Sequence, residues 1–217
     1  MLSVSLLGAG LLSVGMQGTA LAAAPYVVVL GVAQDAGHPQ IGCSRTCCAT
    51  AWSEGGHRVS SLGLVDPDTG QHWLLDATPD LPAQAHDLPG TLAGIVLTHA
   101  HMGHYTGLMY LGREAMGAKE VPVWAMPRMG SFLRSSGPWS QLVDLKNIVI
   151  QDIVAGQPVQ LSPSLRVTPL LVPHRDEFSE TVGLVVEGPS RRVLYLPDID
   201  KWSRWSTAIE DVVRTVD

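Results

Sequence analysis

The segment Thr98–Leu108 reads THAHMGHYTGL and places three histidines, His99, His101 and His104, within six positions. It follows the apolar run LAGIVL at 92–97, whose lack of polar alternation predicts a strand covered on both faces. At the end of a strand, residues two positions apart point to the same side. A loop leaving this strand can therefore direct several imidazole nitrogens into one cavity, which predicts a metal site.

Three further ionisable residues lie where predicted strands end. Asp76 closes the stretch HWLLD, His174 closes LLVPH and Asp198 closes LYLPD. Side chains from such positions can supply the additional ligands that a metal needs from elsewhere in the chain. We expect His57, His72 and His86 to be structural.

Many short strands and a few helices predict an α/β sandwich of sheets with outer helices. No linker rich in Gly, Ser or Pro splits the chain. The segment 33–48 is rich in Gly, Pro, Asp and Cys and predicts a loop. Strands are expected at 26–32, 58–65, 72–80, 92–98, 121–126, 148–153, 157–174, 181–188 and 191–200, a hairpin turn at 66–71, and helices at 106–118 and 129–137.

The composition is that of a globular domain. The chain has 217 residues, of which 46% are hydrophobic and 16% charged, so one domain with a sizeable core is expected. A net charge of −6 and the lack of any basic run argue against binding nucleic acid through a phosphate-neutralising face. A small-molecule substrate is the expected partner, and the oligomeric state is left open.

Residues 1–22 are apolar, uncharged and rich in small residues, and they end in ALA. This pattern predicts a signal peptide cleaved after Ala22, a periplasmic or secreted protein, and a domain over 23–217. The stretch is too rich in glycine for a stable membrane span. No Lys or Arg precedes Arg45, so we expect the true start of the signal to lie upstream. The alternative is a buried N-terminal helix.

The cysteines of the chain are Cys43, Cys47 and Cys48. An exported protein can oxidise one pair, but an odd count leaves one thiol over, and a bridge between neighbours is strained. The three thiols can instead help to hold a structural zinc, with His38 or His57 as a fourth ligand. Small buried thiols in a loop are the third possibility, and the sequence leaves all three open.

The motif THAHMGH resembles the His-x-His-x-Asp-His signature of the metallo-β-lactamase superfamily. HWLLDATPD is similar to the strand that ends in that superfamily's usual aspartate, VPH to its next histidine and LYLPDID to its metal-bridging aspartate, so the resemblance covers most of the chain. LGVAQDAGHPQIGC, LTHAHMGHYTGLMYLGREAMGA and PHRDEFSETVGLVVEGP resemble, more narrowly, proteins similar to pyrroloquinoline-quinone biosynthesis protein B. Those proteins carry a cysteine-rich zinc loop in the place of Cys43, Cys47 and Cys48, with a different spacing.

The resemblance implies an αββα sandwich with metals at the sheet edge. By position, His99, His101 and His174 would bind the first metal. His104 and Asp198 would serve the second, with Asp198 bridging the two sites and Asp200 as the alternative for Asp198.

The chain departs from the superfamily pattern at two places. Gly103 stands where the motif has an aspartate, so we expect one tightly bound metal and a weak or empty second site. The sequence also stops at Asp217, before the superfamily's last strand, helix and histidine. We therefore expect an incomplete domain that lacks its C-terminal part.

Three neutral histidines and one open position are typical of catalytic zinc, which lowers the pKa of a bound water from about 15.7 to about 7. The resulting hypothesis is a hydrolase in which metal-bound hydroxide attacks an ester, amide or phosphodiester. Asp198 would accept a proton from the attacking water, and His104 would serve in proton transfer. Zinc is the expected metal, and iron or manganese also suits these ligands.

Two other functions compete with the hydrolase. One is an accessory protein of pyrroloquinoline quinone biosynthesis or transport, and the other is a non-catalytic metal-binding module. Arg175, which follows His174, is a candidate for an anionic group of a substrate or for an ion pair with Asp176 or Glu177. Asp35 and His38 are weaker candidates for the lining of the same cavity.

Overall fold

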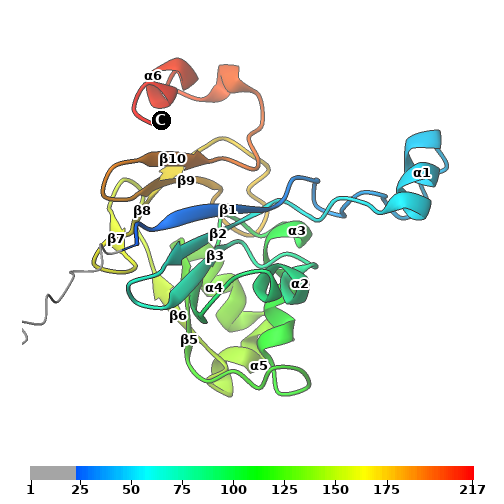
Figure 1. Cartoon of the computed structure of the whole chain (residues 1–217), viewed down its shortest axis with the longest axis horizontal. Coiled ribbons are helices and arrows are strands. Elements are labelled where there is room, and N and C mark those ends of the chain that lie inside the picture. The colour runs from blue at the N-terminus through cyan, green and yellow to red at the C-terminus, as the bar shows by residue number, and fades with distance from the viewer. Residues whose placement is uncertain (1–22) are drawn as a thin grey trace, which may run out of the picture.

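The computed structural model describes residues 23–217, so the predicted signal peptide at 1–22 lies outside the described residues. The strands form two sheets, a larger one in the order β1-β2-β3-β4-β5-β6 and a smaller one in the order β10-β9-β8-β7 (Figure 1). The strands are β1 (Tyr26–Gly31), β2 (Ser61–Asp66), β3 (Gln71–Leu75), β4 (Thr91–Val96), β5 (Val121–Ala125), β6 (Ile148–Asp152), β7 (Val159–Gln160), β8 (Arg166–Leu171), β9 (Val182–Glu187) and β10 (Arg192–Tyr195). The helices are α1 (Thr46–Glu54), α2 (Leu81–His86), α3 (Met102–Tyr105), α4 (Pro127–Ser135), α5 (Trp139–Asp144) and α6 (Ile209–Val213), with 3₁₀ helices η1 (Thr106–Leu111) and η2 (Trp202–Arg204).

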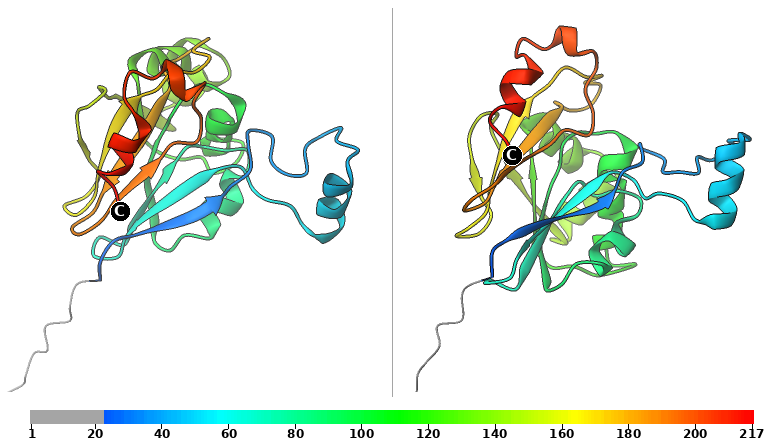
Figure 2. Two further views of the ribbon diagram at one scale, coloured as in Figure 1. Left: turned by 90° about the horizontal axis from the view of Figure 1, so that it is seen from above. Right: turned by 45° about the horizontal axis from the view of Figure 1, so that its top comes forward.

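The larger sheet is covered on both faces. One cluster of buried apolar residues, including Leu74, Ile95 and Leu133, fills the space between this sheet and α2, α4, α5 and η1. A second cluster, including Trp73 and Leu184, lies between the two sheets. Helix α6 lies on the outer side of the smaller sheet (Figure 2). These layers confirm the predicted α/β sandwich of sheets with outer helices.

The strand directions bring four chain segments to one end of the sandwich. β2 and β3 form the hairpin predicted at 66–71, and β3 and β4 then run parallel. β8 and β10 are both antiparallel to β9 and therefore run parallel to each other. The carboxyl ends of parallel strands lie at the same edge of a sheet. The residues after β3 and β4 therefore lie at one edge of the larger sheet, and the residues after β8 and β10 lie at one edge of the smaller sheet.

The helix expected at 106–118 is shorter and of a different type. It is the 3₁₀ helix η1, and Gly112 ends it in an extended conformation. Glycine stabilises a helix poorly, and two more glycines interrupt the predicted span. At Gly107 the helix also passes so close to the segment after β3 that an added Cβ would lie 2.0 Å from the carbonyl oxygen of Thr78. Close packing against the strand end therefore overrides the helical spacing of the apolar residues.

The segment between β1 and β2 projects from the body of the domain as an arm that carries α1 (Figures 1 and 2). The predicted loop at 33–48 is correct for most of its length, but α1 was not predicted. Only Cys48 and Ala51 of this helix are buried, so the sequence carries no apolar stripe that would identify it.

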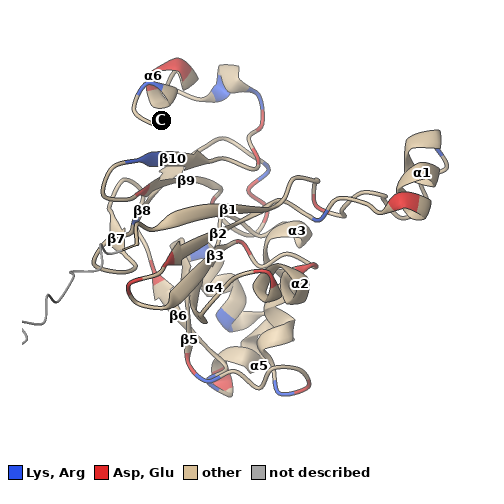
Figure 3. Ribbon diagram, viewed as in Figure 1, with Lys and Arg blue, Asp and Glu red and all other residues tan. Residues whose placement is uncertain are grey.

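The C-terminal residues lie beside the smaller sheet, and charged residues occur on both segments (Figure 3). Asp217 accepts hydrogen bonds of 2.8 Å from the guanidinium of Arg191 and from the backbone N–H of Arg192. Glu187 on β9 pairs with Arg166 and Arg192, and the hydrogen bond from Arg166 leads the interactions that lower the pKa of Glu187. Within residues 23–217, no helix has both the length and the apolar character needed to cross a bilayer.

Candidate metal centre

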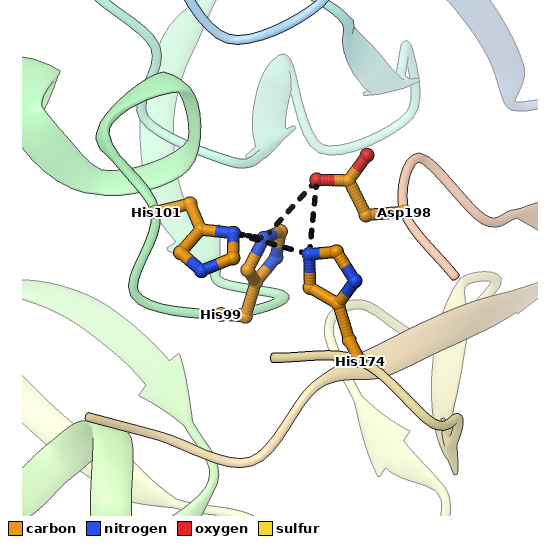
Figure 4. A group of neighbouring side chains, drawn as sticks. All are labelled: His99, His101, His174 and Asp198. Atoms are coloured by element: carbon orange, nitrogen blue, oxygen red, sulfur yellow. Dashed lines mark hydrogen bonds and ion pairs between the residues drawn. The ribbon is translucent and has the colours of Figure 1, made fainter. Parts of the chain in front are cut away.

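Four side chains converge at the end of the sandwich. His99 and His101 come from the loop after β4, His174 follows β8, and Asp198 follows β10 (Figure 4). Their ligand atoms all lie within 4.8 Å of one another. The ring centroid of His174 lies 4.8 Å from that of His101 and 5.1 Å from that of His99. The structure therefore brings His174 close to His99 and His101, which lie about 75 positions earlier in the chain.

The spacing of these ligand atoms suits a tetrahedral cation. Nδ1 of His101 lies 3.0 Å from Nε2 of His99 and 3.1 Å from Nε2 of His174. Oδ2 of Asp198 lies 3.2 Å from Nε2 of His99 and 3.8 Å from Nε2 of His174. Metal–ligand bonds of about 2.1 Å give neighbouring ligand atoms a separation of about 3.4 Å in a tetrahedron.

Hydrogen bonds outside this group direct lone pairs toward its centre. The hydroxyl of Thr98 donates to Asp76, so it accepts from Nδ1–H of His99 and leaves Nε2 of His99 without a proton. Nε2 of His101 lies 3.0 Å from the carboxylate of Glu177, which fixes the proton on that side of the ring. Nitrogens that face one another with lone pairs repel, and a cation between them removes this repulsion. The donor set therefore fits a metal ion.

Burial favours neutral imidazoles, the form that binds metal. Desolvation lowers the pKa of His99 and also that of His174. The hydrogen bond from His104 leads the interactions that hold the pKa of Asp198 well below its usual range, so this carboxyl is ionised. His99, His174 and Asp198 are thus in the protonation states that a divalent cation requires.

His104 lies behind this group, on α3. Its Nδ1 contacts Oδ2 of Asp76 at 2.7 Å, and its Nε2 lies 3.0 Å from Asp35 and 3.3 Å from Asp198. Burial opposes the charged form of this ring, but the charge of Asp76 and the hydrogen bonds of the three carboxylates raise the pKa of His104 to about 12. This negative field also attracts a cation.

Asp76 is the fully buried residue that organises the loop after β4. Its carboxylate accepts hydrogen bonds from the backbone N–H of Thr98 at 2.8 Å and from the hydroxyl of Tyr195 at 3.1 Å. The φ angle of Asp76 is 68°, a left-handed conformation that Asp tolerates better than most residues. A strained residue held by this many contacts is typical of a functional site.

The cysteine-rich loop differs in its cysteine pairing from the structural zinc site that the sequence left open for Cys43, Cys47 and Cys48. Cys43 and Cys48 form a disulfide, and Cys47 has a free, exposed thiol. His38, Cys47 and Cys48 offer ligand atoms within 4.8 Å of one another. A disulfide sulfur is not the thiolate that zinc binds, so a site made by all three cysteines is incompatible with this pairing.

A cavity of about 1270 Å³ opens beside the histidines. The arm forms one wall, and His174, Arg175, Asp198 and Asp200 contribute to the other. Asp35 and His38 both line this cavity, as the sequence suggested. The sequence placed Glu177 near the metal, in the loop after His174, but not in contact with His101. Tyr195 was not identified as part of the site, because it acts through Asp76 and no motif marks it.

Arg175 makes no ion pair with any residue of the described chain. Asp176 instead accepts a hydrogen bond from Thr181, and Glu177 contacts His101. The ion pair considered for Arg175 is therefore absent within residues 23–217. Its guanidinium lies 3.5 Å from Nδ1 of His101, at the mouth of the centre.

Comparison with known proteins gives curated relatives and solved structures of the same fold. The coenzyme PQQ synthesis protein B of Methylorubrum extorquens is 26% identical over 205 residues, which is 79% of this chain and 64% of that protein. The protein of the same name from Xanthomonas euvesicatoria is also 26% identical, with the same coverage. The chain thus spans 64% of the length of these relatives.

Among solved structures, zinc-bound PqqB from Methylobacterium extorquens matches with a TM-score of 0.67 and 24% identity, covering 80% of this chain and 65% of that one. A diphosphatase of the PhnP family matches with a TM-score of 0.57 and 22% identity, covering 75% of this chain and 61% of that one. These likenesses support the fold. The family model described as the β-lactamase superfamily domain matches residues 64–217. The chain therefore belongs to the metallo-β-lactamase superfamily.

Proposed function

We propose that this protein is a metal-dependent hydrolase of an ester, amide or phosphodiester bond. The observation that carries the proposal is the convergence of the ligand atoms of His99, His101 and His174 beside Asp198 and an open cavity. A metal ion held there would supply Lewis-acid chemistry: it would lower the pKa of a water molecule to about 7 and polarise a carbonyl or phosphoryl oxygen. Zinc is the expected ion, because imidazole and carboxylate ligands in this geometry suit it.

Each residue of the centre has a separate role in the proposed reaction. His99, His101 and His174 hold the ion, and Thr98 and Glu177 keep the first two rings in the required tautomers. Asp198, which is partly exposed to the cavity, accepts the proton of the attacking water. The carboxylates of Asp35, Asp198 and Asp200 on the cavity wall would repel an anionic substrate. A cationic side chain, such as that of Arg175, would offset this repulsion.

Replacement of His101 by alanine tests the hydrolase directly. We expect the hydrolysis of p-nitrophenyl acetate and of bis(p-nitrophenyl) phosphate by the metal-loaded protein to fall by at least about 10²-fold, since loss of a ligand disturbs both the ion and the proton transfer. The assay compares protein stripped by chelator with protein to which zinc is restored. His86→Ala, on the exposed surface of α2, is the matched control. Full activity of His101→Ala would contradict the mechanism.

Arg175 is proposed to bind the anionic group of the substrate. A charge-assisted hydrogen bond contributes about 1.5–3 kcal/mol, so Arg175→Ala should raise KM for an anionic substrate by about 10–100-fold. It should leave KM for a neutral ester nearly unchanged. Steady-state kinetics on one anionic and one neutral substrate provide the test, and an equal rise in both KM values would show that Arg175 acts only on the structure of the loop.

The second candidate function is accessory to pyrroloquinoline quinone biosynthesis or transport. It is favoured by the curated relatives, which are named for the synthesis of that coenzyme and cover 79% of this chain. A deletion strain that loses quinone-dependent dehydrogenase activity, and regains it when pyrroloquinoline quinone is supplied, would favour this function over general hydrolysis.

Export to the periplasm or outside the cell is also part of the proposal. The disulfide between Cys43 and Cys48 supports it, because disulfides persist in oxidising compartments.

A further inference from the structure

The glycine at position 103 faces a carboxylate that comes from another part of the chain. A Cβ added to Gly103 would lie 2.5 Å from Cα of Asp35, 2.8 Å from its Oδ1 and 3.0 Å from its carbonyl oxygen. Real Cβ atoms do not approach other atoms this closely. The backbone of Asp35 therefore occupies the space into which a side chain at 103 would extend.

Asp35 belongs to the loop that follows β1, about 70 positions before the histidine motif. Its Oδ1 lies 3.0 Å from Nε2 of His104, and the same His104 nitrogen lies 3.3 Å from Oδ2 of Asp198. The three ligand atoms all lie within 4.8 Å of one another. Distances of 3.0 and 3.3 Å match the separation of about 3.4 Å between neighbouring ligands of a tetrahedral ion.

The orientation of His104 directs its second nitrogen at both carboxylates. Asp76 holds the Nδ1 side of the ring at 2.7 Å, so Nε2 faces Asp35 and Asp198. Without metal, these two carboxylates accept the proton of Nε2, and a divalent cation bound between the three groups would take the place of that proton. Asp198 Oδ2 is also a member of the first ligand group, so one atom serves both groups.

We propose that Asp35, His104 and Asp198 form a second metal site, in which Asp35 replaces the aspartate that the superfamily motif carries at position 103. Gly103 is required because it leaves room for the Asp35 loop. The proposal rests on the proposed function for its chemistry, since it makes the centre binuclear with Asp198 as the bridge. It revises the expectation of a weak or empty second site.

Metal counting on the full chain tests this proposal. The protein is stripped by chelator, dialysed against Zn²⁺, passed over a desalting column, and its zinc is measured by mass spectrometry. We expect about two equivalents for the wild type and about one for Asp35→Asn, a substitution that keeps the size of the side chain. The affinity for the second Zn²⁺ in titration calorimetry should fall by about 100-fold or more, since loss of even an indirect partner costs 10–100-fold.

Two matched variants separate the role of Asp35 from a general effect of charge or of folding. Asp200→Asn removes the same charge from the wall of the same cavity, but Asp200 is outside both ligand groups, so two equivalents should remain. Gly103→Ala adds only the Cβ that would displace Asp35, and it should also bind about one equivalent. Circular dichroism confirms that each variant is folded, and all variants retain Cys47, so its thiol does not affect the differences.

The outcomes distinguish this proposal from the proposed function. One equivalent in the wild type, or two in Asp35→Asn, overturns the second site even when the protein hydrolyses its substrates. Two equivalents in the wild type, one in Asp35→Asn and no hydrolysis support the second site while they contradict the hydrolase. No bound zinc in the wild type contradicts both.

Discussion

Asp198→Ala is expected to release the metal of the centre and to slow hydrolysis by about 10³-fold or more. The reason is that a single oxygen, Oδ2 of Asp198, lies within 3.2–3.8 Å of Nε2 of His99, His104 and His174. Its removal deprives both ligand groups of their only shared anion, and it removes the proposed proton acceptor, whose contribution alone is about 10²–10⁴-fold. Zinc content after dialysis and kcat/KM at saturating zinc measure the two effects separately.

Asp200→Ala is the control for this prediction, because Asp200 lies two positions further along the same loop and lines the same cavity. From the sequence, Asp200 was the alternative to Asp198 as the bridging aspartate. Its carboxylate forms a 3.8 Å ion pair with Arg204 and belongs to neither ligand group. Should Asp200→Ala lose metal and activity while Asp198→Ala keeps them, the assignment of the bridging aspartate would be reversed.

The sequence predicted much of this site because its residues follow strands. His99, His174 and Asp198 lie where apolar runs end, and parallel strands within each sheet bring such positions to one edge. The spacing of His101 two positions after His99 indicated the direction of its side chain. The ligand atoms of these four residues meet within 4.8 Å in the structure.

The contribution of Asp35 could not be derived in this way. Asp35 is in a loop whose path depends on tertiary contacts such as the pairing of Ala33 with Val59. From the sequence, Gly103 indicated the loss of a ligand. Only the three-dimensional structure reveals that the backbone of another loop fills the vacated space. The cysteine pairing has the same origin, since it depends on how α1 folds the loop that follows Cys43.

Asp76→Ala is expected to lower the free energy of unfolding by about 3–5 kcal/mol in metal-free protein. The buried carboxylate accepts hydrogen bonds from Thr98 and Tyr195 and contacts His104, and the small side chain of alanine would leave these groups without an acceptor in the core. Each buried donor without a partner costs about 1–3 kcal/mol, and breaking a buried ion pair costs about 3–5 kcal/mol. In thermal denaturation this corresponds to a decrease in Tm of roughly 6–20 °C for a chain of this size.

The measurement must be made without metal, because a bound ion stabilises the folded state by mass action and would add its own loss to the change. Urea unfolding of chelator-treated protein gives the value, and Asp144→Ala at the exposed end of α5 should change it by no more than about 0.5 kcal/mol. Asp76→Ala should also reduce zinc binding at His104 more than at His101, since Asp76 directly holds only the first of these rings. An unfolding free energy within about 1 kcal/mol of the wild type would mean that water replaces the carboxylate, and that Asp76 does not organise the loop after β4.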